Sequence, residues 1–120
     1  MELSTKLYIL DDNGQKFMGA GVLWLLEGVE ETGSLLSAAR GMGLSYTKAR
    51  FMLESLEKGL GQKILDRKKG GAEHSGGTLT PFAKEFISLY REFQSEVKAD
   101  AERRFRGFSA SVEKLMEEGK

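Results

Sequence analysis

The spacing of apolar residues along the chain predicts several short helices followed by one long helix. From Ala20 to Thr32, apolar side chains recur at steps of three and four, which is typical of one face of an α-helix. Leu23 and Trp24 widen this face, so we expect a well-buried helix with Trp24 in the core. Gly33 is suited to end the helix because glycine tolerates the left-handed backbone conformation.

Two further helices are predicted, each preceded by a serine. The hydroxyl oxygens of Ser34 and Ser45 can accept a hydrogen bond from an otherwise unpaired backbone N–H at a helix start. Ser34 precedes a short helix over 35–40, and a glycine-rich turn follows over 41–44. Ser45 precedes a helix from residue 46 to about residue 58, whose inner stripe is Ala49, Met52, Leu53 and Leu56. The pattern over 34–59 is that of a helix-turn-helix.

Short β-hairpins are predicted on both sides of these helices. Residues 6–10 are β-prone, and Asn13-Gly14 is a tight-turn signal before a return strand over 16–18, which places an N-terminal hairpin at 5–18. Residues 63–67 resemble a strand, and a polar, glycine-rich loop leads to a return strand at Thr78-Leu79. The second hairpin, over 63–79, has the position of a wing.

The last predicted helix begins at Thr80-Pro81, since threonine is a good N-cap and proline suits the first helical position. Apolar residues then continue at steps of three or four to Leu115, with Gly107 as the point where the helix can bend or break. Such a stripe extends over roughly 50 Å, more than the rest of a small domain can cover. Because exposed stripes of this size favour association, we expect a homodimer interface at Phe82, Phe86, Leu89, Tyr90, Phe93 and Val97.

Together these elements predict a mainly α fold with small β content. The fold class is a winged helix-turn-helix with an N-terminal hairpin and a long C-terminal dimerisation helix. We divide the chain into a winged helix-turn-helix unit over 1–80 and the dimerisation helix over 81–120. A chain of 120 residues has the usual size of one domain.

The distribution of charge adds a candidate partner. The net charge is zero, but residues 34–84 carry nine basic against four acidic residues, a balance of +5. Residues 1–33 carry −4 and residues 85–120 carry −1. This asymmetry favours a middle segment that faces a polyanion such as DNA, although an ordinary solvated surface can carry the same charge.

Composition excludes several other classes. The chain has no cysteine and a single histidine, His74, so we expect no disulfide, no zinc site and no cofactor. It lacks a catalytic Ser/His/Asp set, and its glycine-rich loop lacks the Gly-Lys-Ser/Thr of a phosphate-binding loop, so we do not expect an enzyme. There is no signal peptide and no bilayer-length apolar run, and we expect a cytoplasmic protein without a membrane partner.

The helix after Ser45 is the candidate for DNA recognition. A recognition helix enters the major groove, which is about 12 Å wide, and its first turns reach the base edges. The candidate DNA contacts are therefore Ser45, Tyr46, Thr47, Lys48 and Arg50, with Phe51 beside them. The wing would add contacts to phosphates through Arg67, Lys68 and Lys69, which release counterions. In a homodimer, two such helices would enter major grooves of double-stranded DNA about 34–36 Å apart, or a multiple of that distance.

Two runs also resemble a known family: EETGSLLSAARGMGLSYTKARFMLESLEKGLGQKIL and RKKGGAEHSGGTLTPFAKEFISLY. They are similar to the DNA-binding domain of ModE-type molybdate-responsive regulators, which are relatives of the LysR-type N-terminal domain. The resemblance extends over residues 6–90. Its most specific parts are Thr32-Gly33-Ser34, Ala38-Ala39, residues 42–46, the glycine pairs of the wing and Leu79-Thr80. It implies that Ser45-Tyr46 opens the recognition helix and that the long helix forms the dimer.

The sequence departs from the family pattern in three ways. Arg50 stands where the family usually has an aromatic residue, so the preferred operator sequence is open. Ala83 stands where a glycine is common. The family's small domains that bind molybdate or tungstate have no counterpart in these 120 residues. We therefore expect a regulator without its own molybdate-binding domain, either acting alone or with oxyanion sensing by a separate protein.

A different function fits the same pattern. A winged helix can serve as a protein–protein interaction module that never contacts DNA, and a Ser-x-x-Lys-Ala-Arg run alone is typical of any capped, solvated helix start. The two alternatives differ in salt dependence, because binding to DNA weakens steeply as salt displaces the protein from the phosphates.

Overall fold

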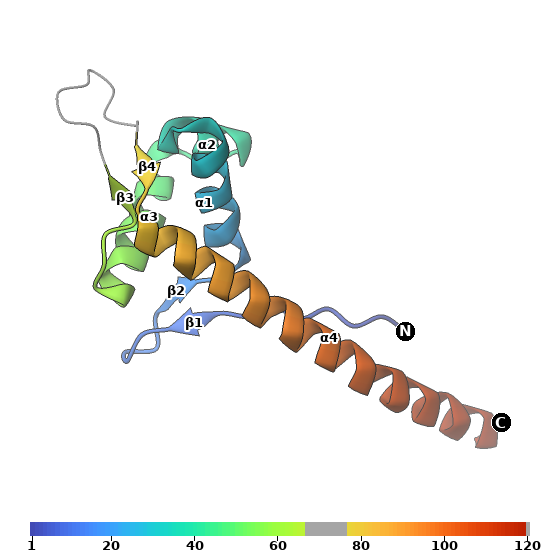
Figure 1. The fold of residues 1–120 in the computed structure, drawn as a ribbon. Helices are drawn as coiled ribbons and strands as arrows, with labels where there is room; N and C mark the ends of the chain where they lie inside the picture. The colour runs from blue at the N-terminus through green and yellow to red at the C-terminus, as the bar shows by residue number, and fades with distance from the viewer. Residues whose placement is uncertain (67–76, 120) are drawn as a thin grey trace.

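The computed structural model describes residues 1–66 and 77–119. Its elements follow the chain order expected of a winged helix-turn-helix (Figure 1), and the prediction of a mainly α fold with small β content is confirmed. The helices are α1 (Ala20–Thr32), α2 (Leu35–Gly41), α3 (Tyr46–Leu60) and α4 (Pro81–Glu118). The strands are β1 (Ile9–Leu10), β2 (Lys16–Met18), β3 (Leu65–Asp66) and β4 (Thr78–Leu79).

Helices α2 and α3 begin at the two predicted serine caps. The Ser34 Oγ accepts a hydrogen bond from the Ser37 N–H at 3.1 Å, and the Ser45 Oγ accepts one from the Lys48 N–H at 3.1 Å. Gly43, between the helices, has a φ of +69°, a left-handed conformation that few other residues adopt without strain. The sequence thus fixes both the start of α3 and the turn that leads into it.

The core is formed where helices α1, α2 and α3 meet the beginning of α4. Its largest fully buried side chains include Leu25, Leu26, Leu35, Leu53 and Leu56. Gly28 of α1 makes the close approach of α2 possible: a Cβ atom at Gly28 would lie 2.9 Å from the Ala38 Cβ. A glycine inside a helix is otherwise unfavourable, so we attribute Gly28 to this contact.

Both short hairpins are antiparallel. Strands β1 and β2 pair Ile9 with Met18, and the ladder is irregular between Ile9 and Leu10. Strands β3 and β4 pair Leu65 with Leu79. The strands are shorter than predicted, and residues 67–76, which include the loop and the predicted strand end at Arg67, lie outside the described residues.

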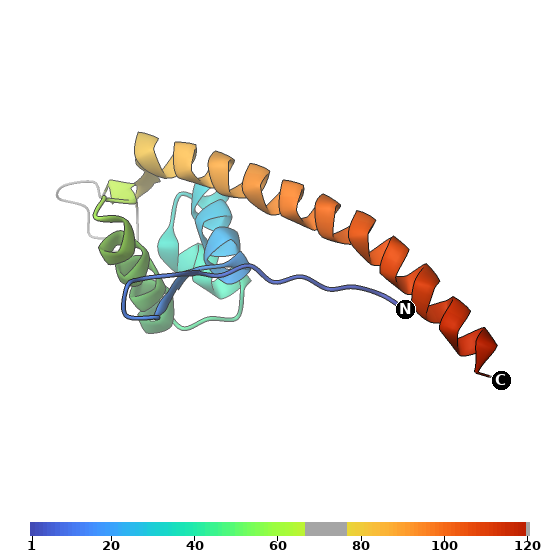
Figure 2. The same cartoon turned by 90° about the horizontal axis from the view of Figure 1, so that it is seen from below.

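Helix α4 is one continuous helix of 38 residues, and it passes through Gly107 without a break. Its predicted cap is present, since the Thr80 Oγ accepts a hydrogen bond from the Ala83 N–H at 3.1 Å. The helix begins on the body and extends well past it, as Figure 2 shows, and the molecule measures 71 Å along its longest axis. The N-terminal segment runs beside the projecting helix in both views.

The prediction that Trp24 lies in the core is wrong. Its side chain is 60% exposed, although its neighbours Leu23 and Leu25 are buried. Helix α1 packs through the side that carries Leu25, Leu26 and Val29, and Trp24 lies off that side. The sequence pattern therefore predicted a broader buried face on α1 than the neighbouring elements cover.

Candidate nucleic-acid and subunit interfaces

Helix α3 buries one side and presents the other to solvent. Ala49, Leu53 and Leu56 are buried in the core. Four residues spaced by three or four positions form the opposite side, which we call the outward face of α3: Thr47, Phe51, Glu54 and Lys58, all exposed. Lys48 is also exposed at the first turn, so the start of α3 is accessible to a ligand.

The predicted DNA contacts of α3 differ in solvent exposure and in whether they already form hydrogen bonds within the chain. Lys48 is exposed and Ser45 uses its hydroxyl to cap the helix. The Arg50 Nε donates a hydrogen bond to the Glu54 Oε1 at 3.1 Å, and the two side chains are 42% and 59% exposed. This bond to Glu54, followed by a hydrogen bond with Tyr46, raises the pKa of Arg50. Arg50 is therefore charged but already partly engaged within its own helix.

The stem of the wing is attached firmly to the body next to α3. The Ile64 N–H donates to a Glu57 carboxylate oxygen of α3 at 2.9 Å, and the Thr80 Oγ donates to the Lys63 carbonyl at 2.8 Å. Gly77 donates to the carbonyl of Gly33 at the end of α1, at 3.3 Å. Three predicted contacts, Arg67, Lys68 and Lys69, lie outside the described residues.

The first half of α4 has two apolar sides. Ala83, Ile87 and Tyr90 are buried against the body. The Tyr90 hydroxyl donates to the Leu7 carbonyl at 3.2 Å, and burial, with a smaller contribution from Tyr8, raises the pKa of Tyr90. Tyr90, which the sequence grouped with the dimer contacts, therefore belongs to the core of its own chain.

A second apolar stripe of α4 lies next to this buried side and is largely exposed to solvent. Phe82, Leu89 and Phe93 are 39%, 61% and 50% exposed, and Phe86 and Val97 are half-buried. The rings of Phe82 and Phe86 stack with their centroids 6.3 Å apart. We call the stripe of Phe82, Phe86, Leu89, Phe93 and Val97 the outer face of α4. It holds five of the six predicted dimer contacts. Phe82, Leu89 and Phe93 are available to a partner, whereas Phe86 also packs against the core of its own chain.

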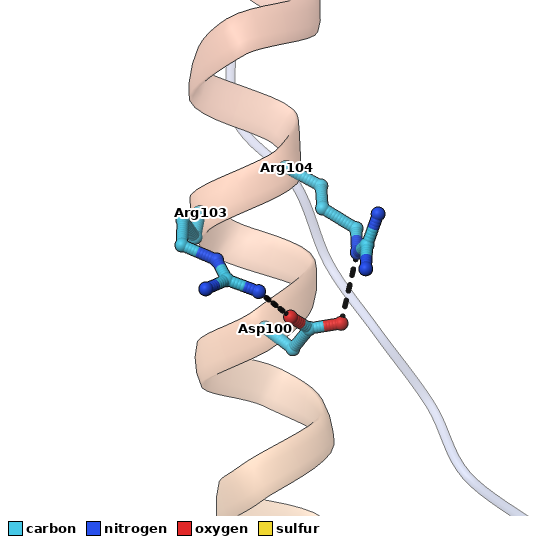
Figure 3. A network of polar contacts seen from close by, with 3 residues as sticks. All are labelled: Asp100, Arg103 and Arg104. Carbon is cyan, nitrogen blue, oxygen red and sulfur yellow. Dashed lines mark hydrogen bonds and ion pairs between the residues drawn. The ribbon is translucent and has the colours of Figure 1, made fainter.

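Beyond Val97, this same side of the helix becomes polar. Asp100 forms ion pairs with Arg103 and Arg104, and the Arg104 Nε lies 2.9 Å from an Asp100 carboxylate oxygen (Figure 3). The hydrogen bond from Arg104 is the main reason that the pKa of Asp100 is lowered. Three large apolar residues in this half are also exposed: Phe108, Leu115 and Met116.

Comparison with known proteins points to one family of regulators. No protein-family model matches the chain. The molybdenum transport protein ModE of Herbaspirillum seropedicae is 33% identical over 92 residues, which cover 77% of this chain and 32% of that protein. The molybdenum-pterin-binding protein MopB of Rhodobacter capsulatus is 32% identical over 89 residues, or 74% of this chain and 33% of that protein.

Solved structures show the same fold. CbnR_DBD in a complex with DNA has a TM-score of 0.57 and 24% identity, covering 72% of this chain and 93% of that one. The LysR family transcriptional regulator CbnR has a TM-score of 0.54 and 24% identity, covering 72% of this chain and 28% of that one. The chain is a winged helix-turn-helix relative of the ModE proteins.

This ModE-related chain spans about a third of the length of the curated relatives it matches. Within the described residues, no group of three or more His, Cys, Asp or Glu side chains is arranged to hold a metal ion. None of the helices in that part of the chain combines the length and the hydropathy needed to span a bilayer.

Sequence reasoning gave most of the candidate site. It placed Phe51 beside the predicted DNA contacts and left out Glu54, although both lie on the outward face of α3. The signal was present, because steps of three and four from Thr47 lead to Phe51, Glu54 and Lys58. Of the predicted DNA contacts, those of the wing lie outside the described residues.

Proposed function

We propose that this protein is a sequence-specific, DNA-binding transcriptional regulator that acts as a homodimer. The observation that carries the proposal is the accessible first turn of α3, where Lys48 and Thr47 are exposed on a helix whose start is fixed by the Ser45 cap. Lysine can donate to guanine O6 and N7 in the major groove. The positive end of the α3 dipole at the same place favours a nearby phosphate.

The solvent-facing apolar residues of α4 support the homodimer. The outer face of α4 places Phe82, Leu89 and Phe93 next to one another in water, a contiguous apolar surface that commonly marks an association site. In this proposal residues 1–80 contact DNA and residues 81–120 join the subunits. The predicted wing contacts Arg67, Lys68 and Lys69 would bind flanking phosphates.

In the proposed homodimer the two α4 helices run antiparallel. At about 100° per residue, the outer face continues along the same side of the helix through Glu96, Asp100, Arg104, Gly107 and Ser111. A second copy that runs antiparallel and crosses at Asp100 places bulky Phe93 opposite small Gly107. It also places Glu96 opposite Arg104. Arg103 and Arg104 compensate the charge of each Asp100 at the crossing (Figure 3).

A crosslinking experiment tests this register. Because the natural chain has no cysteine, Asp100→Cys introduces a single thiol at the proposed crossing, and a short bis-maleimide reagent should join two subunits. Lys98→Cys is the matched control, since Lys98 is exposed but lies on another side of the helix. Crosslinking of Lys98→Cys but not of Asp100→Cys would overturn the register.

Selection of bound sequences from a random DNA pool tests the proposed function. We expect enrichment of two related half-sites whose centres are about 10–10.5 base pairs apart, or a multiple of that spacing. Affinity for the selected site should fall steeply with salt, as expected when basic side chains displace counterions from phosphates. If no sequence is enriched and no duplex binds even at low salt, the protein is instead an interaction module and the proposal is wrong.

We assign no molybdate site to these 120 residues. The relatives named for molybdenum are about three times as long as the matched region. Addition of molybdate or tungstate is therefore expected to leave the DNA affinity of this chain unchanged. A change in affinity at micromolar oxyanion would contradict this part of the proposal.

A further inference from the structure

Phe51 is the most exposed of the large hydrophobic side chains described in the structure, with 69% of its surface in water. It lies at the middle of the outward face of α3, one turn after Thr47 and one turn before Ser55, and its neighbours on that face are polar or charged. An aromatic ring in this position gains free energy by leaving water. Contact with an apolar group that fits among polar neighbours would therefore be favourable at this position.

The surroundings of Phe51 limit what this partner can be. On one side, Phe51 borders a groove formed with the N-terminal hairpin, whose tip carries Asp11 and Asp12. With Glu54 the groove holds three carboxylates against two ammonium groups, Lys16 and Lys58, so it offers a phosphate no net attraction. On the other side lies the first turn of α3, with Lys48 exposed. A duplex attracted to Lys48 would meet Phe51 with its base edges rather than with its backbone.

We infer that Phe51 contacts a thymine methyl group in the major groove and makes the protein prefer thymine at that position of its site. The inference rests on the proposed DNA-binding function. In the major groove, the C5-methyl of thymine is the apolar group that distinguishes one natural base pair from the others, and apolar side chains, including phenylalanine, recognise it by contact. Phe51 lies on the turn that follows Thr47, so both side chains can reach neighbouring base pairs.

Replacement of thymine by deoxyuridine in the selected site tests this inference, because the two bases differ only by the methyl group. At one position of each half-site, the substitution should weaken binding of the natural protein by about fourfold per methyl, as for burial of one such group. Phe51→Ala should bind both duplexes equally. Phe51→Leu, which keeps an apolar side chain, should retain part of the preference for thymine.

Phe108→Ala is the matched control, because Phe108 is also an exposed aromatic residue, at 61%, but lies in the C-terminal half of α4. This variant should discriminate thymine from deoxyuridine as the natural protein does. If the natural protein binds DNA and deoxyuridine has no effect at any thymine, the inference about Phe51 is overturned while the DNA-binding function stands. If the natural protein binds no DNA at all, the proposed function itself fails.

A preference for thymine that survives in Phe51→Ala would also overturn the inference, because another residue would then read the methyl group. The folded state of Phe51→Ala can be checked by its helical circular dichroism. Since Phe51 makes no part of the buried core, we expect the variant to fold as the natural chain does.

Discussion

The outward face of α3 and the outer face of α4 are both exposed helix surfaces on one small body, but their compositions are opposite. The face of α3 contains one large apolar residue, Phe51, among threonine, glutamate and lysine. The face of α4 groups three exposed apolar residues, Phe82, Leu89 and Phe93, within three turns. A single ring among polar groups suits the edges of base pairs, whereas a continuous apolar stripe suits burial against a second subunit.

The difference separates the two proposed tasks of the molecule. Contacts with DNA depend on charge and weaken with salt, whereas association through α4 depends on the removal of apolar surface from water. Changes on one face should therefore leave the property carried by the other face intact, except where dimerisation itself contributes to the affinity for a two-part site. The following predictions test this separation, beginning with the largest expected effect.

Replacing Phe93 with alanine should weaken the homodimer by about 2–4 kcal/mol, as for a central aromatic residue of an interface. The dimer dissociation constant, measured by analytical ultracentrifugation over a range of concentrations, should rise accordingly. Met116→Ala removes an apolar side chain of similar exposure, 61%, from another side of α4 and should leave the dimer unchanged. If both variants weaken the dimer equally, the dimer interface is not confined to the outer face of α4.

Replacing Lys48 with alanine should reduce affinity for the selected DNA site by about 1–3 kcal/mol and relax the base preference. Lys68→Ala or Lys69→Ala, in the wing, should weaken binding to all sequences alike and lower the salt slope by about one. Both effects are measured by fluorescence anisotropy with selected and scrambled duplexes. Identical behaviour of the helix and wing variants would contradict the proposed division of their roles.

Both faces depend on the packing that orients the helices, and Gly28 tests this dependence. Because a Cβ atom at Gly28 would lie 2.9 Å from the Ala38 Cβ, Gly28→Ala should lower the free energy of unfolding by about 1–2 kcal/mol despite its better helix propensity. Gly21→Ala, in the same helix, meets its nearest atom at 3.9 Å and should raise stability by about 0.5 kcal/mol. The midpoint of urea denaturation measures both changes.

The smallest effect is expected at Glu54, which gives the outward face of α3 its one negative charge. Glu54→Gln releases Arg50 from its exposed ion pair and removes repulsion from phosphates. DNA affinity should increase by about 0.5 kcal/mol, mainly at low salt. Glu113→Gln makes the same change of net charge on distant α4 and should change affinity less. A loss of affinity in Glu54→Gln would show that the pair positions Arg50 for binding.

Much of the fold could be predicted because it depends on local interactions. Ser34, Ser45 and Thr80 cap their helices as predicted, since a cap involves only residues three apart. Steps of three and four likewise placed α1, α3 and α4. The break considered at Gly107 did not occur, because the cost of one glycine is about 1 kcal/mol, small for a helix of this length.

The candidate site was predicted less completely, because exposure depends on which neighbours cover a residue. Trp24 and Tyr90 look alike in a hydropathy pattern, yet Trp24 is 60% exposed and Tyr90 is 3% exposed. Tyr90 is covered because the N-terminal segment, 83 residues away in sequence, supplies the Leu7 carbonyl for its hydroxyl. The pairing of Arg50 with Glu54 depended on local spacing and could have been foreseen.

The sequence by itself determined where helices begin and end, because caps, glycines and apolar periodicity act over a few residues. It also determined that α4 extends further than the rest of the chain can cover. Only the tertiary structure decided which apolar side chains remain in water, because burial is a property of packing between distant segments. That decision separates Tyr90 from the outer face of α4 and leaves Phe51 exposed on α3, and the proposed interfaces follow from it.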